Sequence, residues 1–566
     1  MNQHTAALLE QHFDTAFASL EGVARLRELI LTLAMQGKLV EQDPEDQPAS
    51  ELLKEIAAEK QRLIDEKKIR KQRPLQPVTE EEMPYQLPEN WEWVRLRDIG
   101  HDWGQKTPGN QFTYIDVGSI NNDTGEISSP QLVEAAAAPS RARKIVQPGT
   151  VIYSTVRPYL LNIAVIEKEY EPEAIASTAF AIIHPFKEMS AKFIYYYLRS
   201  PSFISYVEST QKGVAYPAIN DGNFFSGVFP LPPIAEQQRI VTKINELMTH
   251  CDALEALHQQ HTEKRLKIHS AAIQQLLEQP ESDAWDFIQK HFNELYSVPE
   301  NVSELRKAIL QLAVMGRLVP QDPNDPPASQ LLEDIQAEKE KLIAEKKIRK
   351  QKLPSAVTPK EAFYEIPESW KWSRLGEITL ESDSGWSPSC LPEKKSGNQW
   401  GVLKVSAVSW GEFDPDENKT LPSHLIPRPE IEVKPGDFLI SRANTDELVA
   451  RSVVVKNTPQ KLMMSDKIVR FTLPENINKD YINITNGSYY SRHYYIANAS
   501  GTSSSMKNVS RSVMLALPVP LPPLPEQHRI VTKIDQLMTL CDQLDEQITT
   551  RNEKQQALLD AVMTQI

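Results

Sequence analysis

The chain has 566 residues, of which 40% are hydrophobic and 24% charged, and its formal net charge is −14. This composition is typical of a folded globular protein with several domains, and it excludes a disordered chain. The acidic balance argues against a surface that is basic throughout, but it is compatible with local basic patches.

The cysteine content and the N-terminal residues indicate where the protein works. Three cysteines (Cys251, Cys390 and Cys541) are too few for a disulfide framework and fit a reducing compartment. The first residues lack the basic-then-apolar pattern of a signal peptide, and no apolar run is long enough to cross a bilayer. No group of Cys and His residues has the spacing of a zinc site. We therefore expect a cytoplasmic protein without a bound metal.

Residues 1–95 are predicted to form a helical region. Apolar residues recur at helical spacing from Val23 to Leu39. A loop containing Gln42-Asp-Pro44 follows, and Ser50 is the expected N-cap of the next helix, as Ser329 is in the second half. That helix ends in a basic run, residues 67–73, which is more typical of a solvated helix end than of a DNA contact.

Residues 96–230, which we call the first insert, are predicted to form a mixed α/β domain. Their β-branched and aromatic residues are interrupted by Gly, Pro and Asn. Strands are expected at 151–153, 163–166 and 180–183, and a short helix at 193–198.

A proline segment ends the first insert and leads directly into a long helix. In Leu231-Pro-Pro-Ile-Ala-Glu236 the two prolines cannot continue a strand, and the glutamate lies in the first helical turn, where negative charge is favoured. Over 234–279 the apolar residues are spaced alternately by four and three, which is the pattern of a heptad seam. The seam consists of Ile240, Ile244, Leu247, Cys251 and Leu254. A helix of about 40 residues spans about 60 Å.

The second half of the chain repeats the first. The copies lie 279 residues apart in the helical region (Leu26 and Leu305) and 290 apart at the proline segment (Leu231 and Leu521). The flanking regions are therefore closely repeated, whereas the inserts between them differ. The repeat predicts a central helical region at 231–374 with helices at 300–350, a second α/β insert at 375–520, and a C-terminal long helix at 521–566. The expected fold is mixed α/β: two α/β domains joined by long, antiparallel, coiled-coil-like helices, with an internal pseudo-two-fold repeat.

The sequence lacks the usual motifs of enzymes of this size. It contains no phosphate-binding loop, no dinucleotide fingerprint, no nucleophile elbow and no His-Glu-x-x-His helix. Asp325-Pro-Pro-Ala328 lacks the aromatic residue that a DNA amino-methyltransferase stacks on a flipped base. Pro415-Asp416 and Glu432-Val-Lys434 fit a loose pattern of metal-dependent nucleases, but such short strings are common by chance. We therefore favour a binding protein without catalytic residues.

The repeated parts resemble the specificity subunit of type I DNA restriction-modification systems over nearly the whole chain. The most specific feature is Leu-Pro-Pro-x-x-Glu-Gln-x-Arg-Ile-Val, found at 231–241 and 521–531. Pro148-Gly149 to Pro158 and Pro435-Gly436 to Asn444 resemble a Gly-Asp-x-Leu-x-Ser strand of such domains, except that Thr150 replaces the aspartate in the first insert. The resemblance implies two target-recognition domains that read an asymmetric, bipartite double-stranded DNA site. It also implies that partner modification subunits, two in number, methylate adenine, and that a restriction subunit cleaves DNA. S-adenosylmethionine, ATP and Mg²⁺ are then expected on those partners, and no cofactor on this chain.

The candidate DNA-binding residues are polar, basic or aromatic side chains of the two inserts. Phosphates are bound by Lys, Arg, Ser and Thr, and base edges by Arg, Lys, Asn, Gln and Ser. In the first insert we select Ser154, Arg157, Tyr159, Lys212 and Tyr216. In the second we select Lys404, Ser441, Arg442, Asn444, Ser504 and Lys507.

Two other classes of function remain open at this point. A stand-alone nuclease or regulator would bind bipartite DNA, and a nuclease would cleave it with Mg²⁺ and no partner. A protein scaffold would bind other proteins through both inserts and show no sequence-dependent DNA binding.

Overall fold

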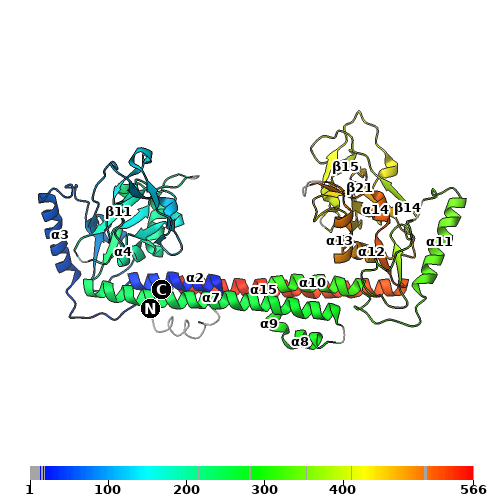
Figure 1. Ribbon diagram of the computed structural model, residues 1–566, viewed down its shortest axis with the longest axis horizontal. Coiled ribbons are helices and arrows are strands. Elements are labelled where there is room, and N and C mark those ends of the chain that lie inside the picture. Colours follow the sequence, from blue (N-terminus) through cyan, green and yellow to red (C-terminus); the bar gives the residue numbers. More distant parts are fainter. Residues whose placement is uncertain are drawn as a thin grey trace. The chain divides into compact units, whose positions relative to one another are not determined.

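The chain folds into two compact units, seen in the computed structural model in Figure 1. Unit 1 comprises residues 1–263 and 551–566, and unit 2 comprises residues 264–550. Each unit therefore contains one insert and the end of the long helix that begins in the other unit. The structure describes residues 13, 17, 19–187, 189–213, 216–279, 282–351, 354–409, 411–501 and 506–564.

Unit 1 surrounds the first insert with helices. The helices are α2 (Leu20–Met35), α3 (Ala49–Asp65), α4 (Ala191–Leu198), α5 (Pro201–Thr210), α6 (Asp221–Ser226) and the long α7 (Ile234–Glu278). The strands are β1 (Glu92–Arg95), β2 (Gly100–His101), β3 (Phe112–Ile115), β4 (Ile120–Asn121), β5 (Glu126–Ile127), β6 (Gln131–Val133), β7 (Ala142–Ile145), β8 (Val151–Ser154), β9 (Ile163–Val165), β10 (Ala174–Ser177), β11 (Phe180–Pro185) and β12 (Val228–Leu231).

The first insert is built on two four-stranded sheets, in the orders β6-β3-β10-β7 and β2-β11-β8-β9. The neighbours pair antiparallel except β3 and β10, which are parallel. The strands predicted at 151–153, 163–166 and 180–183 are confirmed as β8, β9 and β11, and the predicted short helix is confirmed as α4.

Unit 2 has the same plan around the second insert. Its helices are α8 (Ala284–Lys290), α9 (Phe292–Leu295), α10 (Pro299–Val314), α11 (Ala328–Ala344), α12 (Lys479–Gly487), α13 (Tyr489–Asn498), α14 (Arg511–Leu515) and the long α15 (Leu524–Thr564). Its strands are β13 (Lys371–Arg374), β14 (Glu381–Ser384), β15 (Gly401–Leu403), β16 (Asn418–Thr420), β17 (Phe438–Ser441), β18 (Ala443–Asn444), β19 (Ser452–Val454), β20 (Leu462–Met463), β21 (Ile468–Thr472), β22 (Lys507–Asn508) and β23 (Pro518–Leu521). The sheets have the orders β14-β21-β17-β19, β16-β15-β20, β18-β22 and β13-β23.

A two-stranded ribbon closes each insert at its base. β1 pairs antiparallel with β12, so that Glu92 lies opposite Leu231. β13 pairs with β23 in the same register, with Lys371 opposite Leu521. The chain therefore leaves each insert beside the point where it entered, and the proline pair then ends the strand and starts the long helix.

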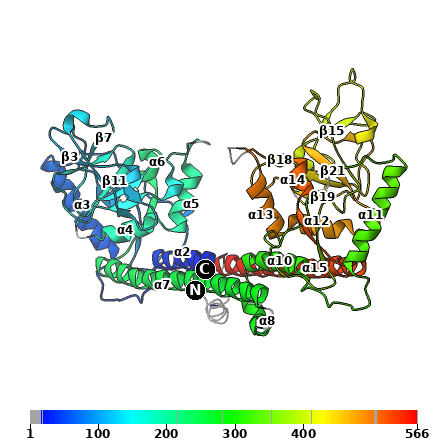
Figure 2. The same cartoon turned by 45° about the vertical axis from the view of Figure 1, so that its right-hand side comes forward.

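The predicted heptad seam is buried at Ile240, Ile244 and Cys251, and its Leu247 and Leu254 are partly buried. α2 lies along α7 in unit 1, and α10 lies along α15 in unit 2, in both views (Figures 1 and 2). Ile240 and Ile244 are fully buried in the core that also contains α2. Cys251 and Cys541 are each 2% exposed and carry free thiols, as expected for small apolar residues of a seam.

Two local predictions need correction. The helix predicted over 23–39 is α2, which ends at Met35 because Gly37 takes a left-handed φ of +67°. Ser50 is wrong as the cap of α3, and so is Ser329 for α11: the helices begin at Ala49 and Ala328, with Pro48 and Pro327 at the N-cap positions. In place of a serine hydroxyl, a main-chain carbonyl oxygen accepts the hydrogen bond from the first helical N–H. Ala49 N donates to Asn90 O at 3.0 Å, and Ala328 N donates to Ser369 O at 2.9 Å.

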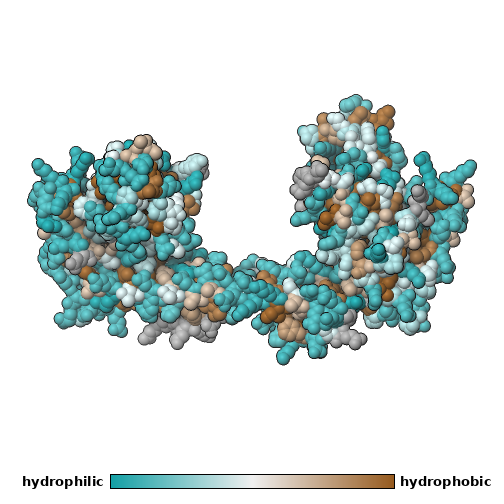
Figure 3. Space-filling view, in the orientation of Figure 1, coloured by the Kyte–Doolittle hydropathy of each residue, from teal (hydrophilic) through white to brown (hydrophobic). Residues whose placement is uncertain are grey.

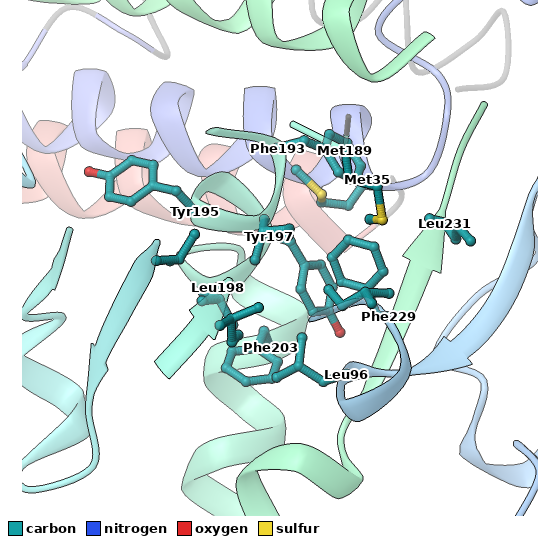
Figure 4. Close-up of a cluster of buried hydrophobic side chains, with 14 of the residues drawn as sticks. Met35, Leu96, Met189, Phe193, Tyr195, Tyr197, Leu198, Phe203, Phe229 and Leu231 are labelled. Atoms are coloured by element: carbon teal, nitrogen blue, oxygen red, sulfur yellow. The ribbon is translucent and has the colours of Figure 1, made fainter. Parts of the chain in front are cut away.

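The core of unit 1 joins the first insert to its helices. Figure 4 shows Phe193 and Tyr197 of α4 beside Met35 of α2 and Phe229 of β12. The visible face of each unit is mostly hydrophilic, with scattered apolar residues (Figure 3). Within the described residues, none of the helices is both long enough and apolar enough to span a membrane.

Candidate nucleic-acid interface

A buried glutamate attaches each insert to its long helix. In unit 1, Glu236 is 1% exposed and accepts hydrogen bonds from Trp91 Nε1 (2.8 Å) and from the side-chain amide of Gln42. The amide of Gln42 also donates to Gly37 O at 3.1 Å. One carboxylate therefore connects the start of α7 to the loop after α2 and to the segment that enters the first insert.

The same contacts recur in unit 2. Glu526 is 1% exposed and accepts hydrogen bonds from Trp370 Nε1 (2.9 Å) and from Gln321 Nε2 (2.6 Å). Burial raises the pKa of both glutamates above its ordinary value, and these hydrogen bonds oppose the increase. The two donors therefore favour the ionised form of each carboxyl group, against the effect of burial.

The next residues of the Glu-Gln-x-Arg motif make main-chain and ionic contacts. Gln237 accepts a hydrogen bond from the Ser190 N–H at 3.0 Å and donates to Pro232 O at 3.0 Å. Gln527 does the same with the Asn478 N–H (2.9 Å) and Pro522 O (3.0 Å). The arginine of each motif pairs with an aspartate of the loop after α2 or α10: Arg239 with Asp46, and Arg529 with Asp325, each at 2.6 Å.

Two loops form the exposed rim of the first insert. The first follows β8 and the second precedes α6, and they pair through a bridge between Val156 and Ala218. The Arg157 N–H also donates to Pro217 O at 2.8 Å. Ser154 lies inside this junction: its side chain is buried and its Oγ donates to Val156 O at 2.8 Å.

The other four candidates of the first insert are exposed on this rim. Arg157 has a left-handed φ of +50°, and its guanidinium lies 5.0 Å from the ring centre of Tyr216. Tyr216 is 69% exposed and Tyr159 is 52% exposed. Lys212 is also exposed, and its main chain pairs with Ala218 in both directions. The rim therefore presents two cations beside two aromatic rings, which suits phosphates and unstacked bases alike.

The second insert builds a rim on the same main-chain pairing. Ala443 lies opposite Asn508, and Asn444 opposite Lys507, in the β18–β22 ribbon. Ser441 is fully buried, and its Oγ lies 3.3 Å from the carbonyl oxygens of Leu448 and Arg451. Ser441 and Ser154 therefore hold equivalent loops in place, and neither hydroxyl is exposed.

The polar candidates of the second rim contact side chains of neighbouring loops. Arg442 Nε lies 3.4 Å from Asn508 Oδ1, and Asn444 Nδ2 donates to Ser409 Oγ at 2.9 Å. Lys507 Nζ is 3.7 Å from Asp446. Lys404 lies at the start of the turn that ends in Ser409, with its Nζ 3.5 Å from Glu417. Ser504 lies outside the described residues.

The structure adds Arg492, which the sequence did not single out. It lies on α13, with its Nη2 3.4 Å from the carbonyl oxygens of Asp446 and Glu447 in the rim loop. Desolvation, and then the charge of nearby Arg451, lower the pKa of Arg492 to about 10. Its Nη1 is buried and has no hydrogen-bond partner among the residues that the structure describes. The signal for Arg492 in the sequence was a charged residue within a stretch rich in aromatic residues, Tyr489 to Tyr495.

Thr150 performs the role of the aspartate that it replaces. Its Oγ1 accepts a hydrogen bond from the Gln147 N–H at 3.1 Å, as Asp437 accepts one from the Lys434 N–H at 2.9 Å. Thr150 Oγ1 also lies 3.0 Å from His184 Nδ1. The turn before the central strand is therefore closed in both inserts.

The two acidic residues of the nuclease-like pattern, Asp416 and Glu432, have different contact partners. Asp416 forms an exposed ion pair with Lys394 at 3.0 Å. Glu432 accepts a hydrogen bond from the Lys461 N–H at 2.5 Å. Across the described part of the chain, no cluster of three His, Cys, Asp or Glu residues has the arrangement of a metal site.

Comparison with known proteins extends these observations. A family model described as the type I restriction modification DNA specificity domain matches residues 88–263 and 367–553. The chain is 37% identical over 560 residues to the EcoEI specificity subunit of a type I restriction enzyme from Escherichia coli, covering 96% of this chain and 93% of that protein. It is 31% identical over 569 residues to the EcoAI specificity subunit from Escherichia coli, with the same coverage. Among solved structures, the HsdS subunit from Thermoanaerobacter tengcongensis is 22% identical with a TM-score of 0.46, covering 85% of this chain and 98% of that one.

Proposed function

The chain belongs to the family of type I restriction-modification specificity subunits, and we propose that it recognises an asymmetric, two-part DNA target. In this role it is a non-catalytic DNA-recognition subunit with two DNA specificity domains. Each insert reads one part of the target. Because the side chains of the two rims differ, the two half-sites differ in sequence.

The observation that carries this proposal is the shared main-chain construction of the two rims. The bridge between Val156 and Ala218 corresponds to the pair Ala443 and Asn508, and both rims lie at the end of a central strand whose serine is buried. On this common support the first insert presents Arg157, Tyr159, Lys212 and Tyr216, and the second presents Lys404, Arg442, Asn444 and Lys507. Arg492 supports the rim loop of the second insert from α13. Within the DNA site, arginine and asparagine are the residues best suited to bidentate contacts with guanine and adenine.

Ser154 and Ser441 have a different role in this proposal. Their hydroxyls are buried and bonded within the rim loops, so they position the loops and do not contact DNA. We keep Ser504 as a candidate by its position in the sequence alone.

Partner subunits supply the chemistry. We infer that modification subunits carrying S-adenosylmethionine, two per complex, methylate adenine in the two half-sites, and that a restriction subunit using ATP and Mg²⁺ cleaves unmodified DNA. The complex would work in the cytoplasm, where DNA is accessible and the thiols of this chain stay reduced. Because the net charge is −14, much of the phosphate neutralisation would come from basic surfaces of the partners.

The long helices would set the length of the unread gap between the half-sites. α7 is continuous over 45 residues and contributes to both units. One added turn lengthens a helix by about 5 Å, which is more than one base-pair step of duplex DNA. Insertion of four residues into α7, between 254 and 266, with a matching insertion in α15 is therefore expected to lengthen the gap. An unchanged gap in the methylated sites would refute this role of the helices.

The reading role is tested by mapping methylated adenines in cells that express this chain with its partner subunits. We expect Arg157→Ala to relax or abolish recognition of one half-site, with a loss of roughly 5- to 150-fold in binding to the matched site. Arg442→Ala should affect the other half-site alone. Lys168→Ala, which removes an exposed cation from the β9–β10 loop of the first insert, is the matched control. Equal weakening at every target base by Arg157→Ala would assign this residue to phosphate contact, and unchanged maps for both arginine variants would refute these reading sites.

A further inference from the structure

Each unit contains a small socket that receives the end of a long helix. In unit 1, Phe17 and Leu29 enclose Leu559, close to the end of α15, and these three side chains are 2–3% exposed. Leu26, Leu33 and Leu558 complete the cluster. These six side chains of the socket are all apolar.

The equivalent socket of unit 2 is polar at its centre. Tyr296 stands where the repeat places Phe17, and His269 of α7 stands where it places Leu559, at the 279- and 290-residue spacings of the repeat. His269 is fully buried, and its Nε2 lies 3.1 Å from Tyr296 Oη. The two rings meet edge to face, with their centroids 5.1 Å apart.

The two sockets share one aromatic contact despite this chemical difference. Phe13 packs against Phe17 with ring centroids 4.8 Å apart, and Phe292 packs against Tyr296 at 4.6 Å. In both units, therefore, an aromatic ring four residues earlier packs against the aromatic side chain of the socket. The sockets differ in the Tyr296 hydroxyl, in its partner on the helix, and in Ala308, which the repeat places at the position of Leu29.

A second pair of equivalent positions also differs between the two sockets. In unit 1, Arg25 of α2 lies 3.8 Å from Asp560, beside Leu559 on α15. The repeat places Glu304 at the position of Arg25 and Ser270 at that of Asp560. Glu304 and Ser270 line one groove of unit 2. The charge on the socket and the charge on the helix end have thus changed together.

We propose that these two pairs of positions are specificity determinants for helix pairing: each socket accepts the long-helix end that begins in the other repeat and rejects the equivalent end from a like half of a second copy of this chain. Leu559 in the socket of unit 2 would leave the Tyr296 hydroxyl buried without a partner. His269 in the socket of unit 1 would be desolvated against Phe17 without a hydrogen bond. Asp560 would also lie beside Glu304, where like charges repel.

A second copy is the relevant competitor because the helical regions outside the inserts, which we call the frame, are otherwise closely repeated. From Ile240 to Leu254 the seam residues of α7 match those of α15 in type, and the aromatic contact in the sockets is shared, so these features would not distinguish the two helix ends. α7 begins in unit 1 and rises about 1.5 Å per residue over 45 residues, so its end cannot turn back into the socket of its own unit. Mispairing therefore requires two chains, and it would join two like halves in place of two different ones.

The test exchanges the helix ends in the full-length chain. The first variant exchanges the two dipeptides: His269→Leu and Ser270→Asp in α7, with Leu559→His and Asp560→Ser in α15. We expect its melting temperature to fall by roughly 5 °C or more, because both sockets lose their matched partner. Its end residues now suit the sockets of like halves, so light scattering should also detect dimers that increase with protein concentration.

A second variant adds the matching exchange in the sockets: Phe17→Tyr, Arg25→Glu, Tyr296→Phe and Glu304→Arg. We expect this combined variant to recover at least half of the decrease in melting temperature. Its mass distribution should return to that of the unchanged chain. If it is as unstable as the first variant, or if the first variant melts within about 1 °C of the unchanged chain, the proposal is overturned.

The repeat provides a matched control and a milder measurement. His250 and Leu540 are an equivalent His/Leu pair at exposed positions of α7 and α15, so exchanging them should leave melting temperature and mass unchanged. If the multiple variants do not fold, single substitutions decide the question. His269→Leu should lower the melting temperature of the unchanged chain but raise that of Tyr296→Phe, and an equal effect in both backgrounds would overturn the proposal.

Discussion

The indole of Trp370 is expected to stabilise unit 2 chiefly by holding the buried carboxylate of Glu526. Trp370→Phe keeps an aromatic ring in the core but removes the Nε1–H that lies 2.9 Å from Glu526 Oε2. Loss of a hydrogen bond to a charged group costs about 1.5–3 kcal/mol, and the space left by the smaller ring adds roughly 1 kcal/mol. We therefore expect unit 2 to lose about 3 kcal/mol of unfolding free energy near pH 8. The measurement is urea denaturation followed by circular dichroism.

The pH dependence of this loss identifies its cause. Burial already raises the pKa of Glu526 above 4.5, and removal of a donor should raise it further. A carboxyl group whose folded pKa is raised destabilises the protein above that pKa, and protonation relieves the penalty as the pH falls through it. The deficit of Trp370→Phe should consequently be smaller at pH 5 than at pH 8.

Two controls separate the carboxylate from simple packing. Trp372→Phe removes an indole from the same segment, where the ring packs against Tyr364 with centroids 5.2 Å apart, so its cost should not depend on pH. In a Glu526→Gln background the pH dependence of Trp370→Phe should disappear. Equal deficits for Trp370→Phe at pH 5 and pH 8 in the otherwise unchanged chain would refute the role assigned to the indole.

Two further predictions concern the turn after α10 and a buried histidine. Gly316→Ala should destabilise unit 2 by roughly 2–4 kcal/mol, because φ is +73° and a Cβ would lie 2.5 Å from Pro367 Cγ; a thermal melt within 1 °C of the unchanged chain would contradict this. Burial, and then the charge of His101, lower the pKa of His184 from 6.5 to about 4, so the unfolded chain takes up this proton first as the pH falls. The stability of unit 1 should therefore decrease between pH 6.5 and pH 4, and His184→Gln should reduce this decrease if melting is compared at pH 7 and pH 5.

The sequence predicted the features whose signals are local or repeated. The seam through Ile240 and Ile244 follows from heptad spacing, and the start of α7 follows from the proline pair. Strand β8 follows from Val151-Ile-Tyr153. In each case the deciding interaction lies within a few residues or one turn, so a short window of sequence contains the information.

Interactions between distant residues were not predictable from such a window. Gln42 and Trp91 meet Glu236 across 194 and 145 residues, and no spacing rule connects them. Ser154 was selected for DNA binding because serine donates to phosphates, but both faces of β8 are covered and its hydroxyl is buried. Ser50 was selected as a helix cap, although the carbonyl of Asn90, 41 residues further along the chain, already satisfies the first N–H of α3. Long-range contacts decided each of these positions.

The hydrogen bonds between the helical regions and the inserts explain how two different inserts fit the same repeated frame. Arg95 donates to Ser226 O at 2.8 Å, and Arg374 donates to Ala516 O at 2.7 Å, so both arginines bind main-chain oxygens of the insert. The glutamine of each Glu-Gln-x-Arg motif likewise receives a main-chain N–H, from Ser190 or Asn478.

The ribbons that close the inserts are also held by main-chain hydrogen bonds. These contacts depend on the path of the backbone and not on the side chains that the insert carries. An insert can therefore differ in its rim residues, and in its length by 11 residues, without losing the contacts that attach it. In the helix-end sockets, by contrast, the contacts depend on side-chain identity. We propose that this dependence makes each socket selective for one of the two helix ends.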